Sequence, residues 1–194
     1  MNQTTSASTL SAGFVPLRLA DRSLAVKAAA VALGVVFLTL ASWVQVPMFP
    51  VPMTLQTFAV LSVGALYGWR MGAATIVLWL GIALVGAPVL SEFKAGPAVF
   101  MGATAGYLAG FVLAGAVVGW FAERGWTRNI VTSVAAMLVG EALIMGLGVA
   151  WLAHLIGFDK AIQYGFTPFL VGDALKLGIA ALGLPFLSRA FRKG

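Results

Sequence analysis

Long apolar segments recur along the chain, and they constrain its fold more than any other feature. Six such segments have approximate bounds 24–46, 54–69, 71–89, 98–121, 129–156 and 166–190. About 20 apolar residues in a helix are enough to cross the hydrocarbon core of a bilayer. In lipid a helix also satisfies its own backbone hydrogen bonds. The pattern therefore predicts an all-α integral membrane protein, a compact bundle of six transmembrane helices.

The composition agrees with this class. Hydrophobic residues make up 61% of the chain and charged residues 9%, whereas soluble domains carry about 25% charged residues. The formal net charge is +6, but the basic residues lie mainly at segment ends, so they indicate membrane topology and not nucleic-acid binding. The chain has no cysteine, which excludes disulfides and thiolate metal sites.

The distribution of the twelve basic residues predicts the orientation. Lys94 and Lys160 lie in connections on one side of the membrane, and Lys176 falls inside the last segment. The remaining basic residues all lie on the side that holds both termini: Arg18, Arg22, Lys27, Arg70, Arg124, Arg128, Arg189, Arg192 and Lys193. By the positive-inside rule both termini are cytoplasmic. The connections 47–53, 86–97 and 157–165 then face outward.

The first 23 residues differ from the rest. Residues 1–13 are rich in Ser and Thr and uncharged, and they lack the features of a secretory signal, so we expect a disordered tail. Residues 14–23 mix apolar side chains with two arginines and are either a short interfacial helix or a charged flank. The expected organisation is an N-terminal segment, 1–23, and one transmembrane domain, 24–190.

Small residues at a spacing of four mark faces where helices approach closely. Gly102, Gly106 and Gly110 form such a ridge, which we expect to pack inside the bundle. Ala28 and Ala32 form a second ridge in the first segment. For this pair, internal packing and a surface reserved for a partner are both open.

Ionisable side chains inside apolar segments are the strongest functional signal, because each costs about 2.5 to 3.5 kcal/mol to insert. Glu141, Asp173 and Lys176 meet this description. Asp173 and Lys176 are three residues apart, so they lie on one helix face. They are either an ion pair that fastens helices or part of a solvent-accessible cavity. Glu141 either bonds a neighbouring helix or takes part in function.

Several kinds of chemistry are excluded or disfavoured. His154 is the single histidine, and no group of acidic residues around it has metal-ligand spacing. The sequence has no phosphate-binding G-x-x-x-x-G-K-[ST] loop and no G-x-S-x-G element. We therefore expect no enzyme activity and no metal or cofactor. Any energy for transport would have to come from another protein.

Four runs of residues resemble motifs of the BioY family, the biotin-specific S components of energy-coupling-factor (ECF) transporters. They are P-V-P-M-T-L-Q-T at 50–57, G-A-P-V-L at 86–90, G-A-T-A-G-Y-L-A-G-F at 102–111 and G-D-A-L-K at 172–176. The resemblance covers residues 24–190. Ala103 and Ala105 replace a proline and a glycine of the family pattern, and the run 91–94 is more charged than the small-residue loop of the family.

The resemblance implies a six-helix S component that binds biotin with high affinity from outside. It implies a bacterial cytoplasmic membrane, a membrane coupling (T) subunit and ABC-type ATPase subunits as partners. The family's first span is thought to present small residues to the coupling subunit, and Ala28 and Ala32 fit that role.

Biotin's chemistry then suggests roles for individual residues. Asp173 could accept the two ureido N–H groups, and Lys176 could donate to the ureido oxygen or pair with the carboxylate. Expected apolar or aromatic lining residues are Phe100, Tyr107 and Trp79, although Tyr107 and Trp79 fit an aromatic belt at the lipid boundary equally well. Neutral hydrogen bonds are expected from Thr54, Gln56 and Thr104.

Three other functions remain open at this point. The first is a stand-alone secondary vitamin transporter in which Glu141 or Asp173 carries a coupling proton. The second is an S component for a different vitamin. The third is a membrane scaffold that transports nothing.

Overall fold

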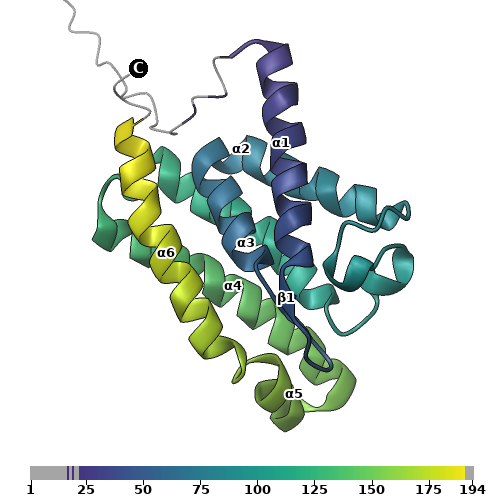
Figure 1. Ribbon diagram of the computed structural model, residues 1–194. Coiled ribbons are helices and arrows are strands. Elements are labelled where there is room, and N and C mark those ends of the chain that lie inside the picture. Colours follow the sequence, from purple (N-terminus) through teal and green to yellow (C-terminus); the bar gives the residue numbers. More distant parts are fainter. Residues whose placement is uncertain (1–16, 18, 20–21, 191–194) are drawn as a thin grey trace, which may run out of the picture.

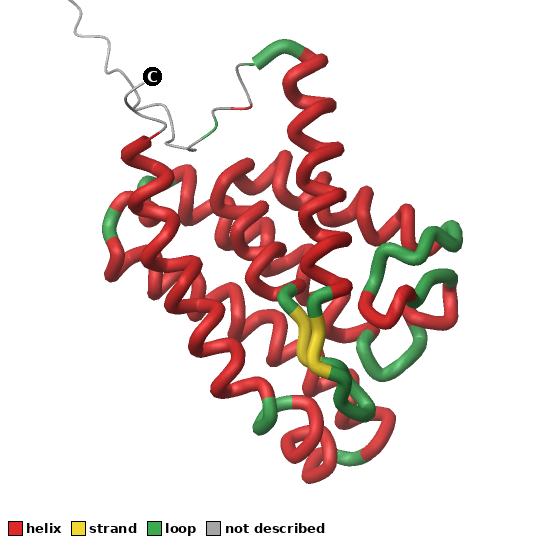
Figure 2. Tube along the Cα trace, in the orientation of Figure 1, coloured by secondary structure: helices red, strands yellow, loops and turns green. Residues whose placement is uncertain are grey.

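The computed structural model describes residues 17, 19 and 22–190, and within them the chain is almost entirely helical (Figures 1 and 2). The expectations for residues 1–16, 18, 20–21 and 191–194 lie outside the described residues. The helices in chain order are α1 (Leu24–Trp43), α2 (Gln56–Leu84), α3 (Ala105–Glu123), α4 (Ile130–Ile156), α5 (Phe158–Gly165) and α6 (Phe169–Ala190). Short 3-10 helices occupy Ser91–Phe93, Pro97–Phe100 and Trp126–Arg128.

These helices account for the six predicted segments because α2 is divided at Gly68. This glycine has φ 79° and ψ 173°, a conformation that glycine adopts without steric cost, and Figure 1 shows the ribbon of α2 turning there. The predicted turn between the second and third segments is thus a break at one residue. α1 to α4 are each long and apolar enough to cross a membrane, and the prediction of an all-α membrane bundle is confirmed.

One predicted segment boundary and one predicted loop were wrong. The fourth segment was expected to begin near residue 98, but α3 begins at Ala105. Gly96 has φ 82°, and the residues that follow Pro97 form only a 3-10 turn before the α-helix begins. The connection 157–165 was expected to be a loop, but it contains α5. Its apolar residues recur at helical spacing, so that Ala161 and Gly165 are buried while Asp159 is exposed.

The connection between α1 and α2 forms a small antiparallel sheet, which the sequence did not predict. β1 (Gln45–Val46) pairs with β2 (Met53–Thr54), with Gln45 opposite Thr54. Figure 2 shows the two strands beside the outer ends of the helices. The hairpin places Thr54 directly before α2, where it contributes to the site described below.

Close helix contacts through glycine hold the centre of the bundle together. A Cβ on Gly110 would lie 2.9 Å from the Cα of Ile144, so α3 and α4 approach closely there. A Cβ on Gly106 would also collide with α4, whereas a Cβ on Gly102 would meet only its own turn. The prediction of internal packing is therefore confirmed for Gly106 and Gly110. α1 is peripheral, because 22% of its apolar window is buried against 56% in α2 and α3.

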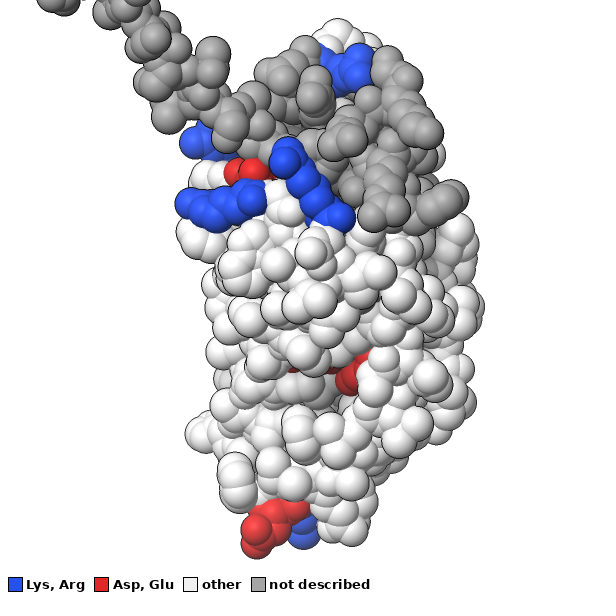
Figure 3. All heavy atoms as spheres, turned by 90° about the vertical axis from the view of Figure 1, so that its left-hand side faces the viewer, with Lys and Arg blue, Asp and Glu red and all other residues white. Residues whose placement is uncertain are grey.

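The charge distribution agrees with the predicted orientation. Figure 3 shows basic side chains gathered at one end, then a broad band that is uncharged except for acidic atoms at mid-height, and charges again at the opposite end. α1 begins and α6 ends at the same end of the bundle (Figure 1). The hairpin and α5 lie at the other end, which is the outward-facing side in the predicted topology.

Candidate functional site

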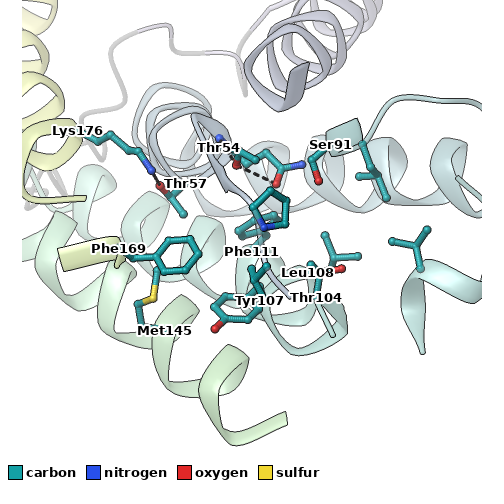
Figure 4. A pocket seen from close by; sticks show the side chains of 15 residues that line it. Thr54, Thr57, Ser91, Thr104, Tyr107, Leu108, Phe111, Met145, Phe169 and Lys176 are labelled. Carbon is teal, nitrogen blue, oxygen red and sulfur yellow. Dashed lines mark hydrogen bonds between the residues drawn. The ribbon is translucent and has the colours of Figure 1, made fainter. Parts of the chain in front are cut away.

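A pocket lies in the half of the bundle that holds the hairpin and α5, enclosed by the hairpin, the start of α2, the start of α3 and α6. We call it the main pocket (Figure 4). Its lining residues are Val51, Pro52, Thr54, Gln56, Thr57, Leu90, Ser91, Val99, Thr104, Tyr107, Leu108, Phe111, Met145, Phe169 and Lys176. The wall is thus mainly apolar with a few hydroxyl, amide and ammonium groups, as is typical of small-ligand sites.

A buried ion pair stands at one edge of the main pocket. Lys176 Nζ lies 2.7 Å from Asp173 Oδ1, and the two side chains are 10% and 7% exposed. Lys176 Nζ also donates to Thr57 Oγ1 at 3.5 Å, and Figure 4 shows it reaching from α6 toward Thr57. An ammonium group has three N–H donors, so one remains for a ligand. Asp173 itself lines the neighbouring cavity between α4 and α6.

Neutral hydrogen bonds fix the polar groups on the opposite side. Thr54 Oγ1 donates to Gln56 Oε1 at 3.1 Å and accepts from the backbone N–H of Gln56 at 3.1 Å. Gln56 Nε2 donates to Ser42 Oγ at 2.9 Å, and Ser42 Oγ donates to the Leu38 carbonyl at 2.7 Å. This network holds the Gln56 amide in one orientation and connects the pocket wall to the outer end of α1.

The first turns of α3 supply Thr104 and Tyr107. The Tyr107 hydroxyl donates to the Gly165 carbonyl at 2.7 Å, which ties α3 to the end of α5. Its ring stacks on Phe169, with centroids 6.3 Å apart. Gly148 leaves room for this ring, since a Cβ there would collide with it. The hydroxyl is thus engaged in the fold, while the ring faces the pocket.

Two of the expected lining residues do not reach the main pocket. Trp79 is fully buried on α2 with its ring 6.3 Å from Phe111, which does line the pocket. Its indole N–H has no hydrogen-bond partner among the described residues. Phe100 is half-buried and packs against the core outside the pocket lining. Trp79 therefore supports the pocket from behind.

Other lining residues were missed by the sequence analysis. Thr57 and Phe111 each end one of the runs that carry the family resemblance, so that signal was present. Met145 and Phe169 had no such signal, because they lie in segments that are apolar throughout. Only the packing of α4 against α6 brings these two side chains to the pocket.

A second surface lies along α1. An apolar groove of about 710 Å³, which we call the α1 groove, is lined by Leu24, Lys27, Ala28, Val31, Ala32, Val35, Val36, Met71, Leu78 and Ile82. Ala28 and Ala32 are exposed in it. Small residues on an exposed helix allow another helix to approach closely.

Comparison with known proteins identifies relatives over most of the chain. The sequence pattern of the BioY family matches residues 7–193. The biotin transporter BioY of Thermotoga maritima is 36% identical over 142 residues, covering 73% of this chain and 83% of that protein. The probable biotin transporter BioY of Pyrococcus horikoshii is 34% identical over 152 residues, covering 78% and 90%.

The fold also matches a solved structure, the S-component for biotin from an ECF-type ABC transporter. The TM-score is 0.73 at 22% sequence identity, with 88% of this chain and 93% of that chain covered. The helical arrangement described above is therefore the fold of that structure.

Proposed function

The chain belongs to the BioY family, and we propose that it captures biotin outside the membrane as the substrate-binding S component of an ECF-type transporter. It is a multi-pass membrane protein and a transporter component, not an enzyme. The BioY proteins of Thermotoga maritima and Rhizobium etli, 36% and 34% identical to this chain, are both named biotin transporters. By this proposal the chain resides in the cytoplasmic membrane of a bacterium.

The observation that carries the proposal is the Asp173–Lys176 pair at the edge of an outward-facing, mainly apolar pocket. Biotin combines an apolar bicyclic ring with a ureido group and a carboxylate. Asp173 supplies a charged acceptor for ureido N–H groups, and Lys176 supplies a charged donor for the ureido oxygen. Hydrogen bonds to ionised groups are about twice as strong as neutral ones, so the pair selects such a ligand over an apolar one.

The remaining polar groups fit the same ligand. The orienting network leaves the Thr54 and Gln56 side chains on the pocket wall, with Thr104 nearby on the same wall. The rings of Tyr107 and Phe169 offer apolar faces to the bicyclic ring and the aliphatic chain. The polar groups of the ligand thus meet the polar side chains of the wall, and its ring and aliphatic chain meet the aromatic side chains.

Ligand entry requires the outer wall to move. The main pocket has a volume of about 30 Å³, which holds about two water molecules. The loop from Leu90 covers its outer side, with the backbone N–H of Glu92 bonded to Gln45 Oε1 of the hairpin at 3.2 Å. Glu92 and Phe93 both have positive φ, 56° and 57°, which costs energy for residues other than glycine. This loop is the segment that we propose opens toward the outside.

We further propose that the α1 groove receives the membrane coupling subunit, with Ala28 and Ala32 at the contact. The groove is apolar, exposed and separate from the main pocket. The sequence has no phosphate-binding loop, and by this proposal ABC-type ATPase subunits supply the energy through that coupling subunit.

The test is a binding measurement on the purified chain. Calorimetry in detergent should show saturable binding of biotin and no binding of thiamine or riboflavin. Mass spectrometry of a sample purified without added vitamin should identify biotin as the retained ligand. A folded sample that binds another vitamin and not biotin would overturn the proposed ligand.

A further inference from the structure

A second cavity adjoins the main pocket on the side of α4 and α6. This lateral cavity has a volume of about 320 Å³ and is lined by Leu138, Glu141, Ala142, Met145, Phe166, Phe169, Leu170, Asp173, Ala174 and Leu177. Figure 3, which views the molecule from the side, shows acidic atoms at mid-height in an otherwise uncharged band. The cavity therefore places carboxyl groups at a depth where a membrane protein normally has none.

Glu141 is the residue in this cavity that the function has not yet used. It is 8% exposed, and its Oε1 atom has no hydrogen-bond partner among the described residues. A buried polar atom without a partner costs about 1–3 kcal/mol, so a purely structural role leaves this oxygen unexplained. Glu141 lines the lateral cavity, so a modest side-chain rotation would present this unpartnered oxygen to a donor brought by a ligand.

The two cavities share two lining side chains. Met145 and Phe169 line both of them, and Figure 4 shows the two side by side. The ion pair spans the same boundary, because Lys176 lines the main pocket and Asp173 lines the lateral cavity. Methionine is flexible and repacks readily. A rotation of Met145 would join the two spaces into one.

Around the boundary between the two cavities, acidic hydrogen-bond acceptors outnumber basic donors. Glu141 interacts electrostatically with both Asp173 and Lys176. The carboxyl groups of Glu141 and Asp173 thus share the ammonium group of Lys176. Even if the two carboxyls hold a proton between them, the cluster has more acceptor sites on its four oxygens than N–H and O–H donors to fill them. A ligand carboxylate placed here would be repelled, whereas N–H groups would be bound. The complement of this cluster is a neutral group that presents N–H donors.

We propose that Glu141 is a further ligand-binding residue. It accepts one N–H of the ligand's ureido group, while Met145 turns aside so that this end of the ligand enters the lateral cavity. This inference rests on the proposed function, since it takes biotin as the ligand. The main pocket is too small for the ligand on its own, and the larger lateral cavity supplies the additional volume. The carboxylate of biotin then points away from the carboxyl cluster.

The experiment combines variants of Glu141 with two biotin analogues, each methylated on one ureido nitrogen. Glu141→Ala should weaken biotin binding about tenfold, as expected for the loss of one hydrogen bond in a buried site. In the wild type both analogues lose an N–H and gain bulk, and so bind more weakly than biotin. We call the ratio of biotin affinity to analogue affinity the methylation penalty. In Glu141→Ala the methylation penalty should shrink about tenfold for one of the two analogues only, because its methyl group fits the space left by the carboxyl.

Two controls keep the result interpretable. Glu141→Gln preserves shape and should fold even if the alanine variant does not, and it should also weaken biotin binding. Glu123→Ala removes a carboxyl on α3 outside both cavities and should change neither penalty. Wild-type biotin affinity in both Glu141 variants, with both penalties unchanged, would overturn the role of Glu141 and leave the proposed function intact. A wild-type chain that does not bind biotin would instead refute the proposed function.

Discussion

The main pocket and the α1 groove differ in both polarity and burial. At the edge of the pocket, Asp173 and Lys176 are buried and paired with each other, and Lys176 also bonds Thr57. In the groove, Ala28 and Ala32 are small, exposed and surrounded by aliphatic side chains. Directional bonds to a small polar ligand need the first arrangement, and close approach of another helix in lipid needs the second. The comparison separates ligand recognition from partner docking.

The two regions meet at one place, the outer end of α1. Ser42 is fully buried there and accepts a hydrogen bond from Gln56 of the pocket wall. The groove lies along the N-terminal part of the same helix, from Leu24 to Val36. Substitutions in the pocket should therefore change ligand binding and substitutions in the groove should change partner assembly, without affecting each other, as is usual for distant sites. Ser42 is the residue through which the pocket wall contacts α1.

The largest effect is expected at the ion pair. Lys176→Met leaves the Asp173 carboxylate without its partner, and breaking a buried pair in this way costs about 3–5 kcal/mol of stability. Biotin binding should fall more than about a hundredfold, because the charged donor is lost and Asp173 is displaced. Thermal unfolding and calorimetry on the same sample measure both quantities.

The double variant Asp173→Asn with Lys176→Met distinguishes a structural role from a ligand role. It removes both members of the pair, so stability should recover relative to Lys176→Met while biotin binding stays weak. Recovered stability together with wild-type affinity would mean that the pair only fastens the helices.

The second effect concerns the α1 groove. Ala28→Trp or Ala32→Trp fills the groove with a bulky ring, so co-purification with the coupling subunit should fall about tenfold or more while biotin affinity stays within about twofold. Leu33→Trp is the matched control, because Leu33 is exposed on α1 but does not line the groove. Equal losses of assembly and of biotin binding would show that these alanines pack within the bundle.

A smaller effect is expected for two tyrosine hydroxyls, that of Tyr107 at the main pocket and that of Tyr67, which bonds α2 to α1 and lines neither the main pocket nor the α1 groove. Tyr107→Phe removes the bond to the Gly165 carbonyl, and Tyr67→Phe removes the 2.7 Å bond to the Ala30 carbonyl of α1. Each should lower the free energy of unfolding by about 1 kcal/mol. Tyr107→Phe should weaken biotin binding a few-fold because Phe169 loses its fixed neighbour, and Tyr67→Phe should leave binding unchanged. Equal effects of both variants on biotin affinity would contradict the separation of the regions.

The smallest effect is expected at Ser42. Ser42→Ala removes the oxygen that accepts from Gln56, so the amide is held less firmly and biotin affinity should fall about threefold. Assembly with the coupling subunit should be unchanged, as measured by co-purification. A loss of assembly without a loss of affinity would assign Ser42 to the groove and not to the pocket.

Most of the fold was predictable from the sequence because lipid imposes simple rules on backbone and side chains. Apolar length located the spans, and Gly68 marked the division of α2. The hairpin was not predictable, because the pairing of Gln45 with Thr54 depends on how the connection folds back. α5 was missed because its helical pattern is short and lies in a connection that also contains charged residues.

The site was predictable only in part. The motifs pointed to Gln56, Thr104, Tyr107 and Lys176, which the structure places on the pocket wall. Trp79 and Phe100 were expected there from their position along the spans, but they lie elsewhere. A helix that is apolar on all sides does not reveal which face is turned to the pocket. That information resides in the packing of the helices.

The central claim, that this chain captures biotin and depends on an ATPase partner for its uptake, is tested by uptake of labelled biotin at trace concentration. Cells should produce the chain with its coupling subunit and with either active or inactivated ATPase subunits. We expect accumulation only with the active ATPase, and surface binding without accumulation otherwise. Accumulation that survives inactivation of the ATPase but collapses with an uncoupler would contradict the account and indicate a stand-alone secondary transporter.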